Sequence, residues 1–171
     1  MIRILGIDPG SRYTGYGIVD CDRGRQQLVA CGRIKAGEGE MGGRLVTIDA
    51  ELRALLLEYQ PVEAAFEQVF VQHNVRSALV LGQARGVALC AAARAGLTIA
   101  EYAPTQIKSA LTGSGRAEKD QVQHMVKLLL KVQGKMAADA ADALAVALTH
   151  AQVRNTRQRT GLALVGSWKR A

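Results

Sequence analysis

Two aspartates open the segment MAADAADALAVALTHA, a run that otherwise consists almost entirely of small and apolar residues. On a helix, the spacing of three between Asp139 and Asp142 places their side chains about 60° apart, on one face. A simpler alternative is that they stabilise the start of the helix, where capping or the helix dipole contributes about 0.3–1 kcal/mol per acid. That alternative accounts for one aspartate better than for two, because a second acid adds repulsion unless a cation lies between them.

Two further carboxylates end predicted strands elsewhere in the chain. Asp8 ends the run IRILGID, which is apolar on both faces and therefore typical of a central strand, although Asp-Pro-Gly is also favourable turn chemistry. Glu67 ends the strand predicted for VEAAFEQVF, and Glu63, at its start, is expected to be solvated. The glycines that follow Asp8 would permit another part of the backbone to approach closely; they are Gly10, Gly15 and Gly17.

The four acids can meet only if the strands that carry Asp8 and Glu67 are adjacent and parallel. Ligands of such sheets collect beyond the carboxyl ends of the strands. Four carboxylates without cations would repel one another and have raised pKa values, and hard divalent cations relieve that repulsion. A ligand set made only of oxygen atoms favours Mg²⁺ or Mn²⁺, and no group of His and Cys indicates zinc. His150 lies about 16 Å along the helix from Asp139, too far to join this site.

The pattern of apolar residues predicts the elements that must position these acids. Three strands joined by tight turns come first, and helices and strands then alternate until two final helices, in the order βββαβαβαα. Residues 45–59, 75–94 and 117–131 are predicted helices, whereas residues 103–116 are expected to be a loop with at most one helical turn. This order indicates an α/β fold with a mixed five-stranded sheet flanked by helices.

A single folded domain is expected. It covers residues 1–153, because neither an internal repeat nor a domain boundary is visible within them. Residues 154–171 are expected to form a basic C-terminal tail that could be disordered.

The composition favours a partner that carries negative charge. The 171 residues include 22 Lys and Arg against 15 Asp and Glu, a formal net charge of +7, which suits a nucleic acid or a membrane surface. No apolar run reaches the ~18 residues of a transmembrane helix, and Asp8 interrupts the first apolar stretch too early for a signal peptide. Three scattered cysteines are typical of reduced thiols. We therefore expect a cytoplasmic protein with no membrane partner.

Five motifs in order resemble the RuvC-type Holliday-junction resolvases: GIDPGSRYTGYG, FEQVF, NVRSALVLGQARG, AEKDQVQHMV and DAADALAVALTH. The resemblance extends from about Ile2 to His150 and does not include the tail. It implies a ribonuclease H-like fold and a homodimeric, magnesium-dependent endonuclease that resolves four-way DNA junctions by paired cuts during recombination and repair. It also implies products with a 5′-phosphate and a 3′-hydroxyl, and a junction branch-migration helicase complex of the RuvA–RuvB type as partner.

The resemblance also implies roles for individual residues. Two Mg²⁺ ions, for which Mn²⁺ could substitute, would be held by Asp8, Glu67, Asp139 and Asp142. Basic residues near the scissile phosphate correspond to Lys108 and Lys119. An aromatic residue that stacks on a junction base corresponds to Phe70. Further candidates for contacts with DNA are Arg76 and Arg116.

Other functions stay open on the sequence. DPGSRYTGYG also resembles the phosphate loop of actin-like and sugar-kinase ATPases, which need a second such domain that is not found here. A related ribonuclease H-like nuclease could act on RNA or on other branched or duplex DNA. A junction-binding protein could bind without cutting, although four intact acids argue against it.

Two glycines raise a separate question about association between chains. Gly82 and Gly86 lie four residues apart on the predicted helix 75–94. Small residues at this spacing either form part of a dimer interface or let the helix lie close to its own sheet.

Overall fold

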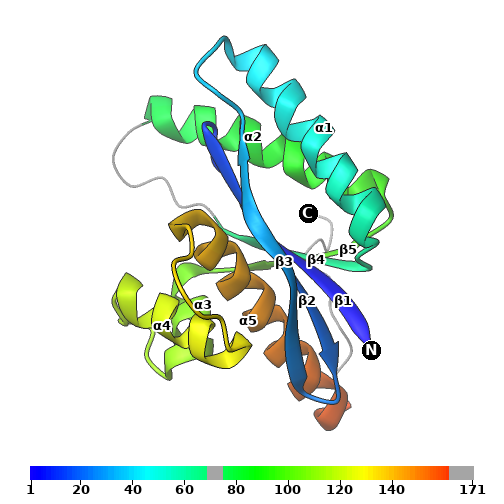
Figure 1. Ribbon diagram of the computed structural model, residues 1–171, viewed down its shortest axis with the longest axis vertical. Helices are drawn as coiled ribbons and strands as arrows, with labels where there is room; N and C mark the ends of the chain where they lie inside the picture. The colour runs from blue at the N-terminus through cyan, green and yellow to red at the C-terminus, as the bar shows by residue number, and fades with distance from the viewer. Residues whose placement is uncertain (69–74, 162–171) are drawn as a thin grey trace.

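The chain forms five strands and five helices within residues 1–68 and 75–161, which are the residues that this computed structural model describes (Figure 1). The strands are β1 (Ile2–Asp8), β2 (Tyr13–Asp22), β3 (Arg25–Lys35), β4 (Glu63–Glu67) and β5 (Thr98–Tyr102). The helices are α1 (Met41–Tyr59), α2 (Val75–Arg94), α3 (Pro104–Thr112), α4 (Lys119–Leu130) and α5 (Ala138–Thr160). The order βββαβαβααα confirms the predicted order apart from one additional helix, α3.

The five strands form one mixed sheet in the order β3-β2-β1-β4-β5. β1 pairs antiparallel with β2 and parallel with β4, and β5 pairs parallel with β4. β1 is therefore a central strand, as its apolar residues on both faces predict, and Ile4, Leu5 and Ile7 are fully buried. The parallel pairing of β1 with β4 fulfils the condition on which the meeting of the four acids depends.

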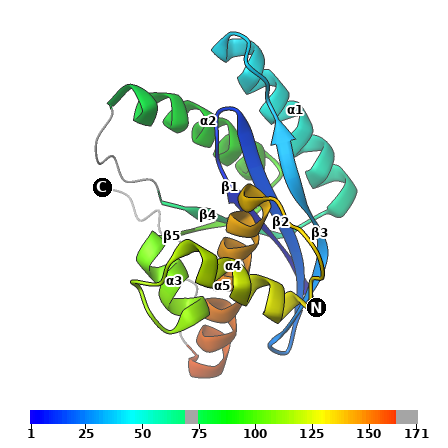
Figure 2. The same ribbon diagram turned by 60° about the vertical axis from the view of Figure 1, so that its left-hand side comes forward.

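Helices cover both faces of the sheet and create two hydrophobic cores (Figures 1 and 2). On one face, α1 and α2 pack against Leu5, Ile7 and Phe66. On the other face, α5 lies across β1 and β2, and α3 and α4 pack beside it in a core that includes Ile4 and Ala65. Strand residues alternate between the two cores because successive side chains of a strand point to opposite faces. No helix in the described part of the chain is long and apolar enough to span a membrane.

α5 lies very close to the sheet because glycines take the place of side chains beneath it. A Cβ atom added to Gly6 would overlap the backbone of Ala143, and one added to Gly15 would overlap the backbone of Asp139. Gly17 leaves room for the same helix. The prediction that Gly15 and Gly17 permit a close approach is confirmed. The alanines of α5 are suited to this contact, which holds the start of the helix firmly against β1 and β2.

α3 is the main difference between the predicted and the observed elements. Residues 103–116 are predicted as a loop with at most one helical turn, and that prediction is wrong for residues 104–112, which form α3. Pro104 occupies the first turn, where its missing N–H costs nothing, and the Gln106 side chain accepts a hydrogen bond from the backbone N–H at the helix start. Ile107 and Leu111, four residues apart, bury their side chains in the core beneath α5. Two apolar positions in nine residues are too weak a periodic signal to detect in the sequence.

α5 also extends further than the sequence indicates. It continues past residue 153 to Thr160, and its last turn contains Arg157 and Arg159, whose positive charges are favourable at a helix C-terminus. The first part of the segment predicted as a tail is therefore helical. Residues 162–171 lie outside the described residues.

Candidate active site

Asp8 and Glu67 lie at neighbouring positions, at the carboxyl ends of the adjacent parallel strands β1 and β4. Each is the last residue of its strand, and the register pairs Ile7 with Phe66 immediately before them. Because Ile7 and Phe66 point toward α1 and α2, the two acids point toward α5. Asp8 is also paired with Gly15 on its other side, where the missing side chain makes room for the start of α5.

Asp139 and Asp142 approach the same place from the start of α5. The backbone of Asp139 rests on Gly15, beside Asp8. Asp142, one turn later, lines a cleft together with Glu67. The structure thus brings the four predicted acids together from three elements, β1, β4 and α5.

The proximity of these carboxylates changes their protonation. Burial, followed by repulsion from the other three acids, raises the pKa of Asp8 from 3.8 to about 7. Burial and then repulsion from Asp142 also raise the pKa of Glu67, and nearby lysines oppose that change without cancelling it. A positive ion close to these acids would relieve the repulsion.

Basic side chains surround the acids. Nζ of Lys119, at the start of α4, lies 2.5 Å from Oδ2 of Asp142, and this hydrogen bond is the main cause of the raised pKa of Lys119. Nη1 of Arg33, on β3, lies 3.9 Å from Oδ2 of Asp139. Lys108 of α3 and Lys119 line, with two of the acids, a cleft of about 250 Å³. The site therefore combines negative charge from β1, β4 and α5 with positive charge from β3, α3 and α4.

The donor atoms of the four acids fit a hard divalent cation. They are oxygen atoms only, and the acids lie close enough to perturb one another's pKa values. Among the described residues, however, no three His, Cys, Asp or Glu side chains already form a geometry that could hold a metal ion. Asp142 and Asp139 each contact a basic side chain instead. The fit rests on the type of donor and on proximity, not on coordination distances.

The structure places the other predicted site residues, apart from Phe70, on or beside α2, α3 and α4. Phe70 lies outside the described residues. Arg76 is exposed on the first turn of α2, and Arg116 is exposed in the loop between α3 and α4, three positions before Lys119. Lys108 and Lys119 lie at the cleft with Glu67 and Asp142, so the predicted lysines and the predicted acids come together.

Arg33 belongs to this site but was not identified from the sequence. It stands in one row with Asp8, because Asp8 pairs with Gly15 and Gly15 pairs with Arg33. Its guanidinium lies 4.5 Å from the centre of the Tyr13 ring, a cation–π contact at the rim of the acid cluster. The signal in the sequence is the alternation of Arg33 and Lys35 on the third strand, but its meaning depends on a strand register that no motif specifies.

Glu63 corrects another expectation. Its place at the start of β4 suggests a solvated side chain, but Glu63 is buried and its carboxylate contacts His150 and Arg154. His150 is paired with Glu63 and not with the four acids, in agreement with its distance along the helix.

The exposed face of α2 excludes one of the two explanations for its glycines. A Cβ atom added to Gly82 or Gly86 would meet no described atom within 4 Å outside the helix itself, so the explanation that they let α2 lie close to its own sheet is wrong. Val75 and Leu79 lie on the same side of α2, and they are 71% and 65% exposed. These four residues, Val75, Leu79, Gly82 and Gly86, form a strip that no residue within 1–68 and 75–161 packs over, called the α2 strip below.

Comparison with known proteins identifies relatives over most of the chain. The family model described as crossover junction endodeoxyribonuclease RuvC matches residues 4–150. The protein of that name from Xanthomonas campestris pv. campestris (strain B100) is 51% identical over 172 residues, 99% of each chain. That from Coxiella burnetii (strain RSA 331 / Henzerling II) is 55% identical over 148 residues, 86% of each chain. The solved structure of Thermus thermophilus RuvC in complex with a Holliday junction substrate matches with a TM-score of 0.85 and 32% identity, covering 95% of this chain and 98% of that one.

Proposed function

The chain belongs to the crossover junction endodeoxyribonuclease RuvC family, and we propose that Asp8, Glu67, Asp139 and Asp142 form its nuclease active site. The protein is an endonuclease that hydrolyses DNA phosphodiester bonds and resolves Holliday junctions, and its fold is ribonuclease H-like. The observation that carries the proposal for the site is the convergence of four carboxylates, in which burial and then the three neighbouring acids raise the pKa of Asp8 to about 7. Titratable groups perturbed in this way by burial and by charged neighbours are typical of functional sites.

Cleavage by this family depends on a metal, and we propose that the four acids hold two Mg²⁺ ions, for which Mn²⁺ can substitute. When bound, such ions activate a water molecule and stabilise the leaving oxygen in an in-line displacement that gives a 5′-phosphate and a 3′-hydroxyl. Asp8 would be the central member of this ligand set, because the other three acids all lie close enough to raise its pKa. The close contact of α5 with Gly15 supports this role, since it holds Asp139 beside Asp8 through the backbone.

The basic side chains are proposed to bind the DNA backbone. Lys119 and Lys108 flank the cleft that contains Glu67 and Asp142, so a scissile phosphate that enters the cleft would meet both ammonium groups. Arg33, 51% exposed and stacked on Tyr13, is the proposed contact for a phosphate on the β3 side. The net charge of +7 adds a general, salt-dependent attraction to DNA. More distant contacts with DNA are proposed for Arg76 and Arg116.

Two matched cuts across a junction require two active sites in one particle. A four-way junction has near two-fold symmetry, so one active site per chain calls for a two-fold dimer in which like surfaces meet. We propose that the α2 strip is the surface that a second copy covers. Its support is the exposure of Val75 and Leu79 and the open space beside both glycines.

Four parts of the proposal rest on the sequence. Phe70 is proposed to stack on an unpaired base at the crossover, which contributes roughly 1–3 kcal/mol per base in comparable contacts. Cooperation with a helicase complex of the RuvA–RuvB type is carried over from the family resemblance. Action in the cytoplasm is proposed from the composition, which includes three scattered cysteines. The nuclease domain is proposed to cover residues 1–153, followed by the basic segment 154–171. α5 crosses this boundary and continues to Thr160.

A cleavage assay on a synthetic four-way junction tests the function directly. In Mg²⁺, the protein is expected to place paired nicks in the junction and to leave a linear duplex and an RNA–DNA hybrid of the same sequence intact. Asp139→Asn should bind the junction but not cut it, whereas Asp49→Asn, a half-buried residue of α1 that pairs with Arg53 and not with the acid cluster, should cut normally. Equal cutting of the hybrid or the duplex would favour the related nuclease, and binding without any cutting would favour the binding module.

A further inference from the structure

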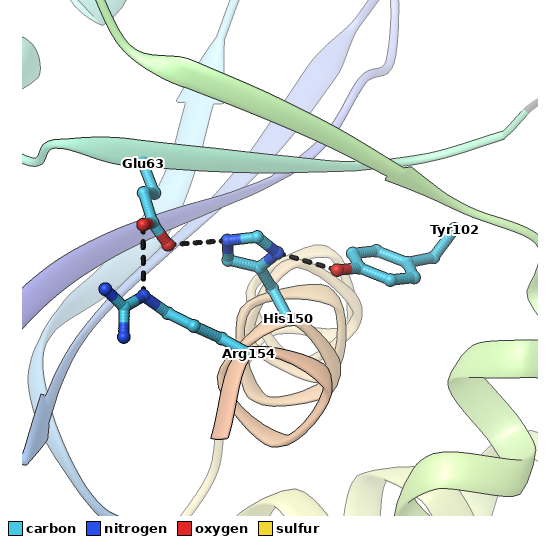
Figure 3. A network of polar contacts seen from close by, with 4 residues as sticks. All are labelled: Glu63, Tyr102, His150 and Arg154. Atoms are coloured by element: carbon cyan, nitrogen blue, oxygen red, sulfur yellow. Dashed lines mark hydrogen bonds and ion pairs between the residues drawn. The ribbon is translucent and has the colours of Figure 1, made fainter. Parts of the chain in front are cut away.

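Four polar side chains form a largely buried network about two turns further along α5 than Asp142 (Figure 3). Nε2 of His150 lies 2.8 Å from Oε2 of Glu63, and the hydroxyl of Tyr102 lies 2.7 Å from Nδ1 of the same ring. Nε of Arg154 donates to Oε1 of Glu63 at 3.0 Å. The His150 side chain is 1% exposed and that of Glu63 is 8% exposed. The network therefore joins α5 to the start of β4 and to the end of β5.

The partners of His150 also define how its ring is used. A carboxylate can only accept, so Nε2–H donates to Glu63, and the Tyr102 hydroxyl can donate to Nδ1. Burial by itself would raise the pKa of Glu63, but its hydrogen bonds with His150 and Arg154 lower it below its ordinary value. Both ring nitrogens and both carboxylate oxygens are thus engaged in directional contacts.

The spacing of this network matches the spacing of the active-site acids. On β4, Glu63 and Glu67 are four residues apart on one face, about 13 Å at 3.3 Å per residue. On α5, Asp142 and His150 are eight residues apart, about 12 Å at 1.5 Å per residue. Glu63 contacts His150, and Glu67 shares the cleft with Asp142. α5 therefore meets β4 at two places, with Glu67 and Asp142 at the cleft and with Glu63 and His150 in the network.

The interaction is repulsive between Glu67 and Asp142 and attractive between Glu63 and His150. Glu67 and Asp142 are both acids at one cleft, so they repel each other where no cation lies between them. Glu63 and His150 attract each other through a hydrogen bond. The contacts of α5 with β1 and β2 go through glycines and alanines, and such van der Waals contacts set a distance without a strong direction. Hydrogen bonds to the His150 ring depend on angle as well as distance. They therefore define where α5 lies along its own axis relative to β4.

We propose that His150 is a positioning residue for the nuclease reaction: held between Glu63 and Tyr102, it sets the register of α5 on β4. That register places Asp142 opposite Glu67. The inference rests on the proposed function, because the register matters for cleavage only if these two acids act together. A merely structural role would change the free energy of unfolding alone, whereas positioning also changes the affinity of the folded protein for a divalent ion.

Mn²⁺ binding without DNA separates these two roles. His150→Leu removes both hydrogen bonds of the ring, and His150→Gln is the conservative variant, because its amide can still reach Glu63. Leu52→Ala, in the core on the opposite face of the sheet, is the control for lost stability. Asp142→Asn removes the proposed ligand itself. Calorimetry gives the Mn²⁺ affinity at a temperature at which each variant is folded by circular dichroism, and the Mn²⁺ concentration at half-maximal junction cleavage is measured in parallel.

His150→Leu is expected to weaken Mn²⁺ binding and to raise the half-maximal concentration by roughly tenfold or more, since a misplacement of about 1 Å can cost 10²-fold. His150→Gln should restore most of that loss, and Leu52→Ala should bind as the wild type does. Wild-type affinity in His150→Leu, or an equal loss in Leu52→Ala, overturns the inference. If Asp142→Asn keeps full affinity, the proposed site fails instead. If His150→Leu does not fold, His150→Asn, too short to reach Glu63, replaces it in the same comparison.

Discussion

Replacing Asp8 by Asn is expected to stabilise the metal-free protein at neutral pH while it abolishes cleavage. The reason is the repulsion among the four acids, which is relieved when one of them loses its charge. Burial and the three neighbouring acids raise the pKa of Asp8 from 3.8 to about 7, so the folded protein holds a proton that the unfolded chain releases. Asn imitates the protonated form at every pH.

The direction and the size of the effect follow from these two pKa values. Between pH ~4 and ~7 the folded wild type binds more protons than the unfolded chain, so its free energy of unfolding falls as the pH rises. The difference between 3.8 and about 7 corresponds to about 4 kcal/mol at 1.36 kcal/mol per pKa unit, which is an upper bound. Screening by salt and solvent reduces it, and we expect the Asp8→Asn variant to be about 1–3 kcal/mol more stable at pH 7.5.

Urea unfolding in EDTA from pH 4 to pH 8 measures this difference. The advantage of Asp8→Asn should be near zero at pH 4, grow through the window and stay constant above pH ~7. Added Mn²⁺ should reverse the order, because an ion that binds the folded wild type stabilises it and the variant has lost a ligand. The control is Asp49→Asn, outside the cluster. If Asp8→Asn is no more stable than the wild type at pH 7.5 in EDTA, the carboxylates do not repel one another as described.

Three further predictions concern the cleft, the dimer and the buried network. Lys119→Ala and Lys108→Ala should each slow single-turnover cleavage by roughly 10²-fold with little loss of junction affinity; weaker binding with a smaller salt dependence as the sole effect would identify them as ordinary phosphate contacts. Leu79→Glu should convert dimers to monomers in sedimentation velocity, whereas Leu57→Glu on α1, at a position that is 79% exposed, should not; a surviving dimer would rule out the α2 strip. Glu63→Gln should destabilise the protein at pH 7, because hydrogen bonds lower the pKa of Glu63 despite its burial, and the loss should disappear as the pH falls through that lowered value. A loss of the same size at pH 3 and pH 7, measured by urea unfolding, would contradict that account.

Local patterns in the sequence carried much of the information about the site. Asp8 could be placed at the end of a central strand because a strand between two layers must be apolar on both faces. Asp139 and Asp142 could be placed on one helix face because their spacing follows the helix period. These inferences need only neighbouring residues, and the family resemblance then implied which acids act together.

Residues whose role depends on distant partners were missed or misjudged. The position of Glu63 at the start of a strand predicts a solvated side chain. It is buried instead, because His150 and Arg154, more than eighty positions later, form hydrogen bonds with its carboxylate. Arg33 has no motif, and it reaches the acids only because Asp8, Gly15 and Arg33 share one row of the sheet. Neither the row nor the partner can be read from residues near in sequence.

The sequence by itself determined the type of chemistry: four oxygen donors, two lysines and an excess of positive charge, carried by elements whose periods are visible in the chain. Only the tertiary structure decided how these groups are arranged. It set the strand order that puts Asp8 beside Glu67, and the glycine contacts that bring α5 onto the sheet. It also placed His150 against Glu63 at the start of β4, and Asp142 in the cleft with Glu67 at the end of that strand. The physical reason is that periodicity and turn chemistry are short-range, whereas register and the burial of paired charges depend on every element that packs around them.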